Sequence, residues 1–227
     1  MSRVSGVPDG TPVRLDPSNA EALHQYGGRL FEWRRPAAVA MTRRALAIEP
    51  ARATTLNNLA WMLAHDGDLA GALVVMDSAV SVEPDYPMGP LYRGILRAAA
   101  ADTAGALADF DLVKRRFAGE WLASAAAGFA GLLRRDTTAA VAAAQAWDAA
   151  AAPWFTSGGS LAVYVDPADL WLAIGRRTEA MDSWEIQPRS AVRYWVMRDA
   201  AVRDPALASD PRFQRLLAAT APPPEFR

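Results

Sequence analysis

The sequence predicts an all-α protein: an α-α superhelix of about four to five helix pairs with a C-terminal helical cap. Two observations predict this fold. Similar residues recur every 34 positions, and the apolar residues inside each 34-residue unit recur at helical spacing. A pair of short helices cannot bury its apolar face alone, so consecutive pairs are expected to stack into one continuous core.

The 34-residue period appears at polar and small positions alike. Small residues are needed where paired helices cross closely, because larger side chains would push the two axes apart. The recurring positions are Asp68, Asp102 and Asp136; Ala72, Ala106 and Ala140; and Ala60, Gly94 and Gly128. We call each such set of residues, spaced by 34 positions, a ladder. Several ladders with the same period indicate a sequence repeat.

Residues 53–84 illustrate one unit. Leu56, Leu59, Ala60 and Leu63 predict a first helix, which Gly67 breaks. Asp68 is then an expected N-cap for a second helix, which ends at Glu83-Pro84 because proline cannot continue a helix.

These units resemble the tetratricopeptide repeat (TPR), a helix–turn–helix unit of 34 residues. The resemblance implies a repeat region over residues 17–150, with repeats at 20–50, 53–84, 87–117 and 121–150. In the third repeat, Pro90 and Arg97 stand where the TPR pattern has apolar residues, and the fourth repeat is degenerate. Residues 1–16 are expected to be a flexible N-terminus, natural or left where the chain was cut from a longer protein, and residues 151–165 an insertion loop.

Residues 166–219 predict a fifth, degenerate repeat followed by capping helices, and residues 220–227 a tail. Asp166-Pro167 is expected to open a helix that ends at Gly175. Ser209 or Asp210 is expected to cap a last helix whose apolar face, led by Phe213, covers the end of the stack. This ending resembles those of bacterial TPR regions attached to winged-helix transcriptional regulators and serine/threonine kinases.

Composition and charge exclude several classes of function. The 227 residues carry a formal charge of −1 without a concentrated basic segment, so no nucleic-acid partner is expected. No apolar run reaches about 18 residues and no secretory signal opens the chain, so we expect a cytoplasmic protein without membrane insertion. The sequence has no cysteine, which excludes disulfides and thiolate metal sites. It does not indicate an oligomeric state.

The sequence offers no catalytic constellation, so no enzyme and no cofactor are predicted. His24 and His65 are 41 residues apart and lack neighbouring metal ligands, so we interpret them as packing or solvated residues and expect no metal. Gly158-Gly159 lacks the residues of a phosphate-binding loop. Asp109 and Asp111 flank Phe110 on a helix and are expected to be solvated.

In TPR proteins the first helices of the repeats line a concave groove. That resemblance implies a polar groove at its N-terminal end that becomes apolar and aromatic further along. The candidate groove residues are His24, Asn57, Asn58, Trp61, Leu91, Tyr92, Ile95 and Phe129.

Some TPR proteins clamp a terminal carboxylate with lysine, arginine and asparagine at these positions. Here Asn58 matches that clamp, but His24, Gly28, Met88 and Tyr92 replace the other residues. A neutral amide without cationic partners cannot hold a carboxylate pair, so this clamp is not expected.

Two functional hypotheses remain. The first is a non-catalytic scaffold that binds an apolar peptide or helix of a partner protein in the groove. The second is a regulatory or sensor module of a larger bacterial transcriptional regulator or kinase. A structural alternative to both is that a C-terminal helix or the segment 147–165 fills the groove, because a wide exposed apolar surface is costly.

Overall fold

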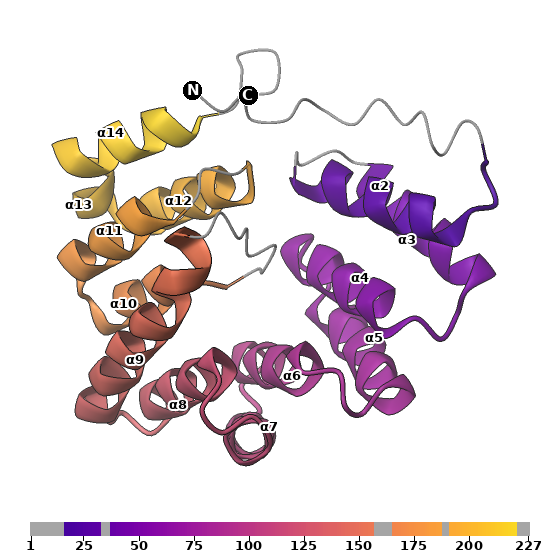
Figure 1. Ribbon diagram of the computed structural model, residues 1–227, viewed down its shortest axis with the longest axis horizontal. Helices are drawn as coiled ribbons and strands as arrows, with labels where there is room; N and C mark the ends of the chain where they lie inside the picture. The colour runs from indigo at the N-terminus through magenta and orange to yellow at the C-terminus, as the bar shows by residue number, and fades with distance from the viewer. Residues whose placement is uncertain (1–15, 33–36, 157–164, 188–190, 222–227) are drawn as a thin grey trace. The chain divides into compact units, whose positions relative to one another are not determined.

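The computed structural model describes residues 16–32, 37–156, 165–187 and 191–221, and every regular element in these ranges is an α-helix (Figure 1). The prediction of an all-α protein is therefore confirmed for the described residues. The helices divide into two compact units, one within Gly6–Ala118 and one within Gly119–Arg227. No described helix is long and apolar enough to cross a lipid bilayer.

Among the described residues, the N-terminal unit contains three consecutive helix pairs. In each pair the two helices pack along one another, and each pair also packs on the next. The helices are α2 (Ala20–Glu32), α3 (Ala37–Ile48), α4 (Ala53–His65), α5 (Leu69–Val82), α6 (Met88–Ala99) and α7 (Thr103–Arg116).

The described part of the C-terminal unit contains two further pairs and three terminal helices. The pairs are α8–α9 and α10–α11, and the last helix, α14, packs on α11 and α12. The helices are α8 (Trp121–Leu133), α9 (Thr137–Thr156), α10 (Pro167–Ile174), α11 (Arg177–Ile186), α12 (Ala191–Arg203), α13 (Pro205–Ala208) and α14 (Pro211–Thr220).

Asp68, Asp102 and Asp136, the aspartate ladder, are all N-cap residues of helices. Asp68 and Asp102 each accept a hydrogen bond of 2.9 Å from a backbone N–H three residues later, and Asp136 accepts one of 3.0 Å. Each aspartate thereby satisfies one of the unpaired donors at the start of the second helix of its pair. The N-cap expected at Asp68 is confirmed, and the same role recurs at both equivalent positions.

The small-residue ladders mark helix crossings, as the sequence predicts. Ala72 and Ala106 are completely buried, and so is Ala60. At Gly94 a Cβ atom would come within 2.6 Å of the Phe110 ring, so a larger residue would force α6 away from α7.

The expectation that Asp109 is solvated is wrong. Its carboxylate is buried on α7 and accepts hydrogen bonds from Arg93 Nη2 (2.6 Å) and Arg97 Nη1 (2.8 Å), both on α6. Asp77 on α5 also accepts a hydrogen bond from Arg93 (3.2 Å), so three helices share this network. A charged residue is tolerated at position 97, where the TPR pattern has an apolar residue, because the buried Asp109 carboxylate pairs with Arg97.

Helix α9 continues to Thr156, six residues into the segment expected to be an insertion loop. The run of alanines before Pro153 favours helix, and Ala151 is buried. Trp147 on the same helix is completely buried and stacks on Trp121 at 5.8 Å between ring centroids. The rest of the expected loop, residues 157–164, lies outside the described residues, as do residues 1–15 and 222–227.

The start and end of α10 and the start of α14 form as predicted. Asp166 caps α10, Gly175 ends it in the left-handed conformation (φ 85°), and Asp210 caps α14. Phe213 on α14 is buried against Trp184 on α11, with ring centroids 5.8 Å apart. Helix α14 therefore covers α11 with an apolar face, as a capping helix should.

Candidate functional site

The candidate groove residues of the N-terminal unit come mainly from α4 and α6, the first helices of two neighbouring pairs. Asn57 and Trp61 are one helical turn apart, so they share a face of α4. The Trp61 ring contacts the Tyr92 ring of α6 edge to face, with centroids 5.0 Å apart and an interplanar angle of 90°. The structure therefore brings together the two aromatic residues that the sequence analysis placed in neighbouring repeats.

Burial separates the candidate residues into two sets. His24, Asn57, Leu91 and Tyr92 are buried, the last with only 2% of its surface exposed. The half-buried residues, which keep accessible side-chain surface, are Asn58, Trp61 and Ile95. Of these candidate residues, the accessible set is the part that a partner could contact.

Phe129 lies on α8 in the C-terminal unit and is half-buried. Its ring contacts Trp147 of α9 at 6.2 Å between centroids. Phe129 is therefore supported by the fully buried tryptophan of its own unit.

Of the two interpretations predicted for His24, packing or solvated, the structure shows packing. It lies on α2 with its Nδ1 atom 3.0 Å from Thr55 Oγ1 on α4, and burial lowers its pKa. No group of three or more potential ligands that could hold a metal ion occurs among the described residues.

Asn57 carries an unusual polar group for a core position. The residue is 3% exposed, and its buried Oδ1 atom has no hydrogen-bond partner among the described residues. A buried acceptor that lacks a donor costs about 1–3 kcal/mol of stability. The face of α4 is therefore not optimised for stability at this position.

Gly28 leaves room for a small side chain beside this face. It lies on α2 at the repeat position that Trp61 and Ile95 hold on α4 and α6. Among the described residues, a Cβ atom at Gly28 would have Asn58 Nδ2 as its neighbour, at 3.7 Å, which is an ordinary contact distance. The glycine at a repeat position where Trp61 and Ile95 are large apolar residues was the sequence signal for this room.

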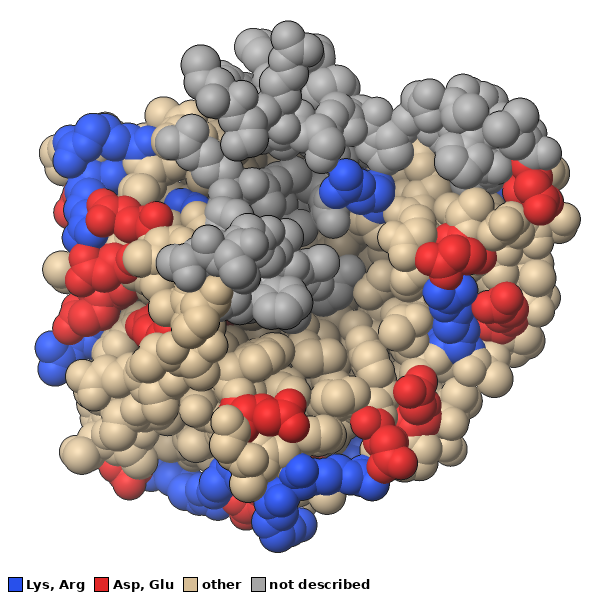
Figure 2. All heavy atoms as spheres, viewed as in Figure 1, with Lys and Arg blue, Asp and Glu red and all other residues tan. Residues whose placement is uncertain are grey.

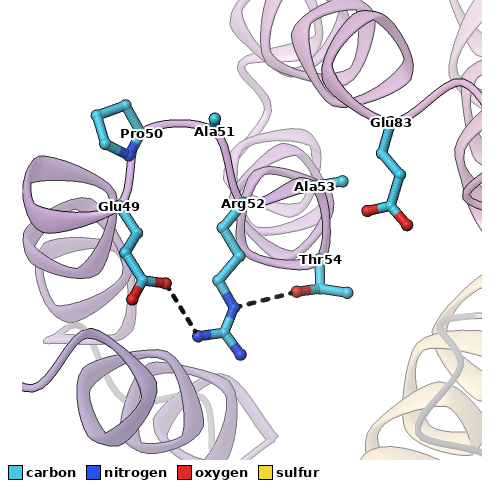
Figure 3. Close-up of a pocket in the computed structure, with 7 residues that line it drawn as sticks. All are labelled: Glu49, Pro50, Ala51, Arg52, Ala53, Thr54 and Glu83. Atoms are coloured by element: carbon cyan, nitrogen blue, oxygen red, sulfur yellow. Dashed lines mark hydrogen bonds and ion pairs between the residues drawn. The ribbon is translucent and has the colours of Figure 1, made fainter.

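A hollow of about 440 Å³ lies where α3 meets α4 (Figure 3). Arg52 borders it and is held by Glu49 (3.3 Å), Thr54 (3.4 Å) and Glu21. Glu83, the residue that follows α5, provides another wall. Because its guanidinium is already paired with two carboxylates, Arg52 does not offer a free cation to a ligand.

The surface charges are mixed. On the face drawn in Figure 2, acidic and basic side chains are interspersed, in keeping with the formal charge of −1. By contrast, the candidate residues on α4 and α6 are all uncharged at neutral pH.

The consecutive helix pairs, small crossing residues and repeated N-caps define an α-helical repeat fold, and comparison with solved structures shows it to be that of TPR proteins. A TPR protein from Parabacteroides merdae aligns over 92% of this chain and 88% of its own, with 16% identity and a TM-score of 0.52. PilW, a type IV pilus biogenesis factor, aligns over 91% and 86%, with 17% identity and a TM-score of 0.55.

A chain of the APC/C hetero-tetramer Cut9–Hcn1 aligns over 92% of this chain and 44% of its own, with 12% identity and a TM-score of 0.59. No family model matches the sequence, and no curated protein matches it. The similarity to solved structures therefore establishes the fold.

Proposed function

We propose that this chain is a non-catalytic interaction scaffold that binds an apolar peptide or helix of a partner protein against α4 and α6. The observation that carries the proposal is the edge-to-face pair of Trp61 and Tyr92 on an uncharged face. Tryptophan contributes a large share of the energy at protein interfaces, since it buries a large area with few rotatable bonds. Trp61 keeps accessible surface for such a contact, and the buried Tyr92 ring packs against it.

The accessible residues Asn58, Trp61 and Ile95 are the proposed contacts in the N-terminal unit. The buried layer of His24, Asn57, Leu91 and Tyr92 is proposed to hold them in position. Phe129 is a second proposed contact, in the C-terminal unit. An uncharged face favours an uncharged segment of the partner, because a charge buried there would lack a counter-ion.

The folds of similar solved structures support the proposal at a general level. One of them belongs to a hetero-tetramer and another to a pilus biogenesis factor, as their names state. Repeat folds present extended surfaces that suit segments of other proteins.

A peptide-display selection on the immobilised full chain tests the proposal. Among random 15-residue peptides, we expect enrichment of uncharged sequences with aromatic or aliphatic residues. The selected peptides should bind Trp61→Ala and Ile95→Ser at least tenfold more weakly. Val74→Ser provides the matched control, because Val74 is an exposed apolar residue on α5 (69% exposed).

Equal binding of the selected peptides to the wild type, Trp61→Ala and Ile95→Ser would contradict a site on α4 and α6. Weaker binding only to Val74→Ser would instead assign the interaction to the second helices of the pairs.

A further inference from the structure

A proline lies in the short segment before each helix pair of the N-terminal unit, a segment that we call a junction. Pro17 lies three residues before α2, Pro50 lies three residues before α4, and Pro84 lies four residues before α6. All three prolines are exposed, and an acidic residue precedes each of them. The three junctions can therefore be compared position by position.

At two of these junctions an arginine of the chain itself binds the proline carbonyl. Arg44 on α3 donates a hydrogen bond of 3.2 Å to the Pro17 carbonyl oxygen. Arg116 on α7 donates one of 2.7 Å to the Pro84 carbonyl oxygen, and it also pairs with the Asp85 carboxylate. In both cases the guanidinium comes from the second helix of the pair that follows the proline.

At the middle junction the corresponding residues are not arginines. The second helix there is α5, where Ser78 stands at the repeat position of Arg44 and Val82 stands at that of Arg116. Among the described residues, no hydrogen bond reaches the Pro50 carbonyl oxygen. This junction contains the hollow of about 440 Å³, which Pro50 lines (Figure 3). The junction with the hollow is thus the one whose second helix lacks the arginine.

The charges around the hollow favour a cation. Glu49 and Glu83, the residues that follow α3 and α5, both line it, and the carbonyl ends of these two helices add partial negative charge. Arg52 also lines the hollow, but its guanidinium is already paired with Glu49 and Glu21. Glu83 forms no ion pair within the described part of the chain. A positively charged group would therefore find a free carboxylate here, whereas an anion would be repelled.

We propose that this hollow binds an arginine side chain of a partner protein, whose guanidinium donates to the Pro50 carbonyl oxygen and is balanced by the carboxylates of Glu49 and Glu83. Arginine suits the hollow better than lysine, because its planar guanidinium has five N–H donors that can reach a carbonyl and a carboxylate together. Arg116 makes this kind of contact, to a carbonyl oxygen and a carboxylate, at the next junction. The proposal does not depend on the binding face on α4 and α6.

NMR titration of the full chain with N-acetyl-argininamide tests this site. We expect saturable shifts of the backbone amides of Ala51, Ala53 and Thr54, which line the hollow. N-acetyl-citrullinamide has nearly the same shape but no charge, so it should bind at least about tenfold more weakly. Trp61→Ala should bind N-acetyl-argininamide as the wild type does, which separates this site from the proposed peptide-binding face.

Two variants that each place an arginine on α5 sharpen the test. Val82→Arg introduces the arginine that the next junction has at this repeat position, so its own side chain should occupy the hollow. Binding of N-acetyl-argininamide should then weaken at least about tenfold. Val74→Arg adds the same charge at a position that is 69% exposed on the same helix, and it should keep wild-type binding. Circular dichroism checks that both variants remain folded.

Several outcomes would contradict the proposal. The absence of saturable shifts at the three amides, or equal binding of N-acetyl-citrullinamide, would exclude a guanidinium site in the hollow. Equal weakening by Val82→Arg and Val74→Arg would show a general effect of charge on α5. Shifts of the same amides that appear when the chain alone is concentrated would assign the hollow to an arginine of a second copy and overturn the assignment to a partner protein.

Discussion

Arg97 on α6 donates a 2.8 Å hydrogen bond to the buried carboxylate of Asp109 on α7. Leu63 holds the equivalent position one repeat earlier, and it contributes to an apolar core. The third repeat thus replaces a hydrophobic contact with an ion pair, to which Arg93 adds a second guanidinium. This exchange requires both charges, because either one alone would be buried without a partner.

Asp109→Asn should lower the free energy of unfolding by about 2–4 kcal/mol, because two partly buried guanidinium groups would lose their counter-ion. Urea denaturation measures this change. Asp111→Asn on the same helix is the control, since Asp111 pairs with Lys114 at a part-exposed site and should lose less than about 1 kcal/mol. Equal losses in the two variants would contradict a buried network.

The residue before each N-cap in the aspartate ladder has a left-handed backbone. Gly67 adopts φ 89°, and the equivalent Ala101 and Arg135 adopt φ 63° and 57°. Left-handed backbone is unfavourable for residues with a Cβ atom, so the second and third turns contain strain that the first avoids.

Ala101→Gly should therefore stabilise the chain by about 0.5–1 kcal/mol, even though glycine increases the entropy of the unfolded state. The converse change, Gly67→Ala, should destabilise it by about 1 kcal/mol. The melting temperatures of both variants, measured by thermal unfolding, test these two predictions. The explanation would be wrong if Ala101→Gly lowered the melting temperature as much as Gly67→Ala does.

Phe213→Ala should cost about 3–5 kcal/mol, because the side chain is 1% exposed and packs on Trp184. Val202→Ala, at a position that is 80% exposed on α12, is the control and should change stability by less than about 0.5 kcal/mol. Denaturant unfolding measures the stability of both variants and so tells whether α14 is a packed capping helix or a loosely attached one. An unchanged midpoint for Phe213→Ala would show that α14 does not cap α11.

The sequence was sufficient to predict the features with local signals. The N-caps at Asp68, Asp166 and Asp210 were predictable because an aspartate before a helix satisfies donors only a few residues away. The buried ion pairs of Asp109 were not predictable, because its partners lie on the neighbouring helix. In the sequence these partners look like ordinary surface charges. Arg97 at an apolar position was the one available indication.

The candidate site was predictable only in part. Repeat register alone placed Trp61 and Tyr92 in neighbouring helices, and their rings are indeed in contact. Register could not show that Tyr92 is buried while Trp61 stays half-buried, because burial depends on how the helices pack. The room for a side chain at Gly28 depends in the same way on the spacing between α2 and α4.

Measuring both the stability and the peptide affinity of Trp61→Ala tests the proposed scaffold function most directly. Trp61 is half-buried, so the variant should lose only about 1–2 kcal/mol of unfolding free energy, whereas Trp184→Ala, from a fully buried position, should lose about 3–5 kcal/mol. Peptide binding should weaken by about 2 kcal/mol or more in Trp61→Ala. A stability loss as large as that of Trp184→Ala, with unchanged peptide affinity, would show that Trp61 belongs to the core and would contradict the proposed binding face.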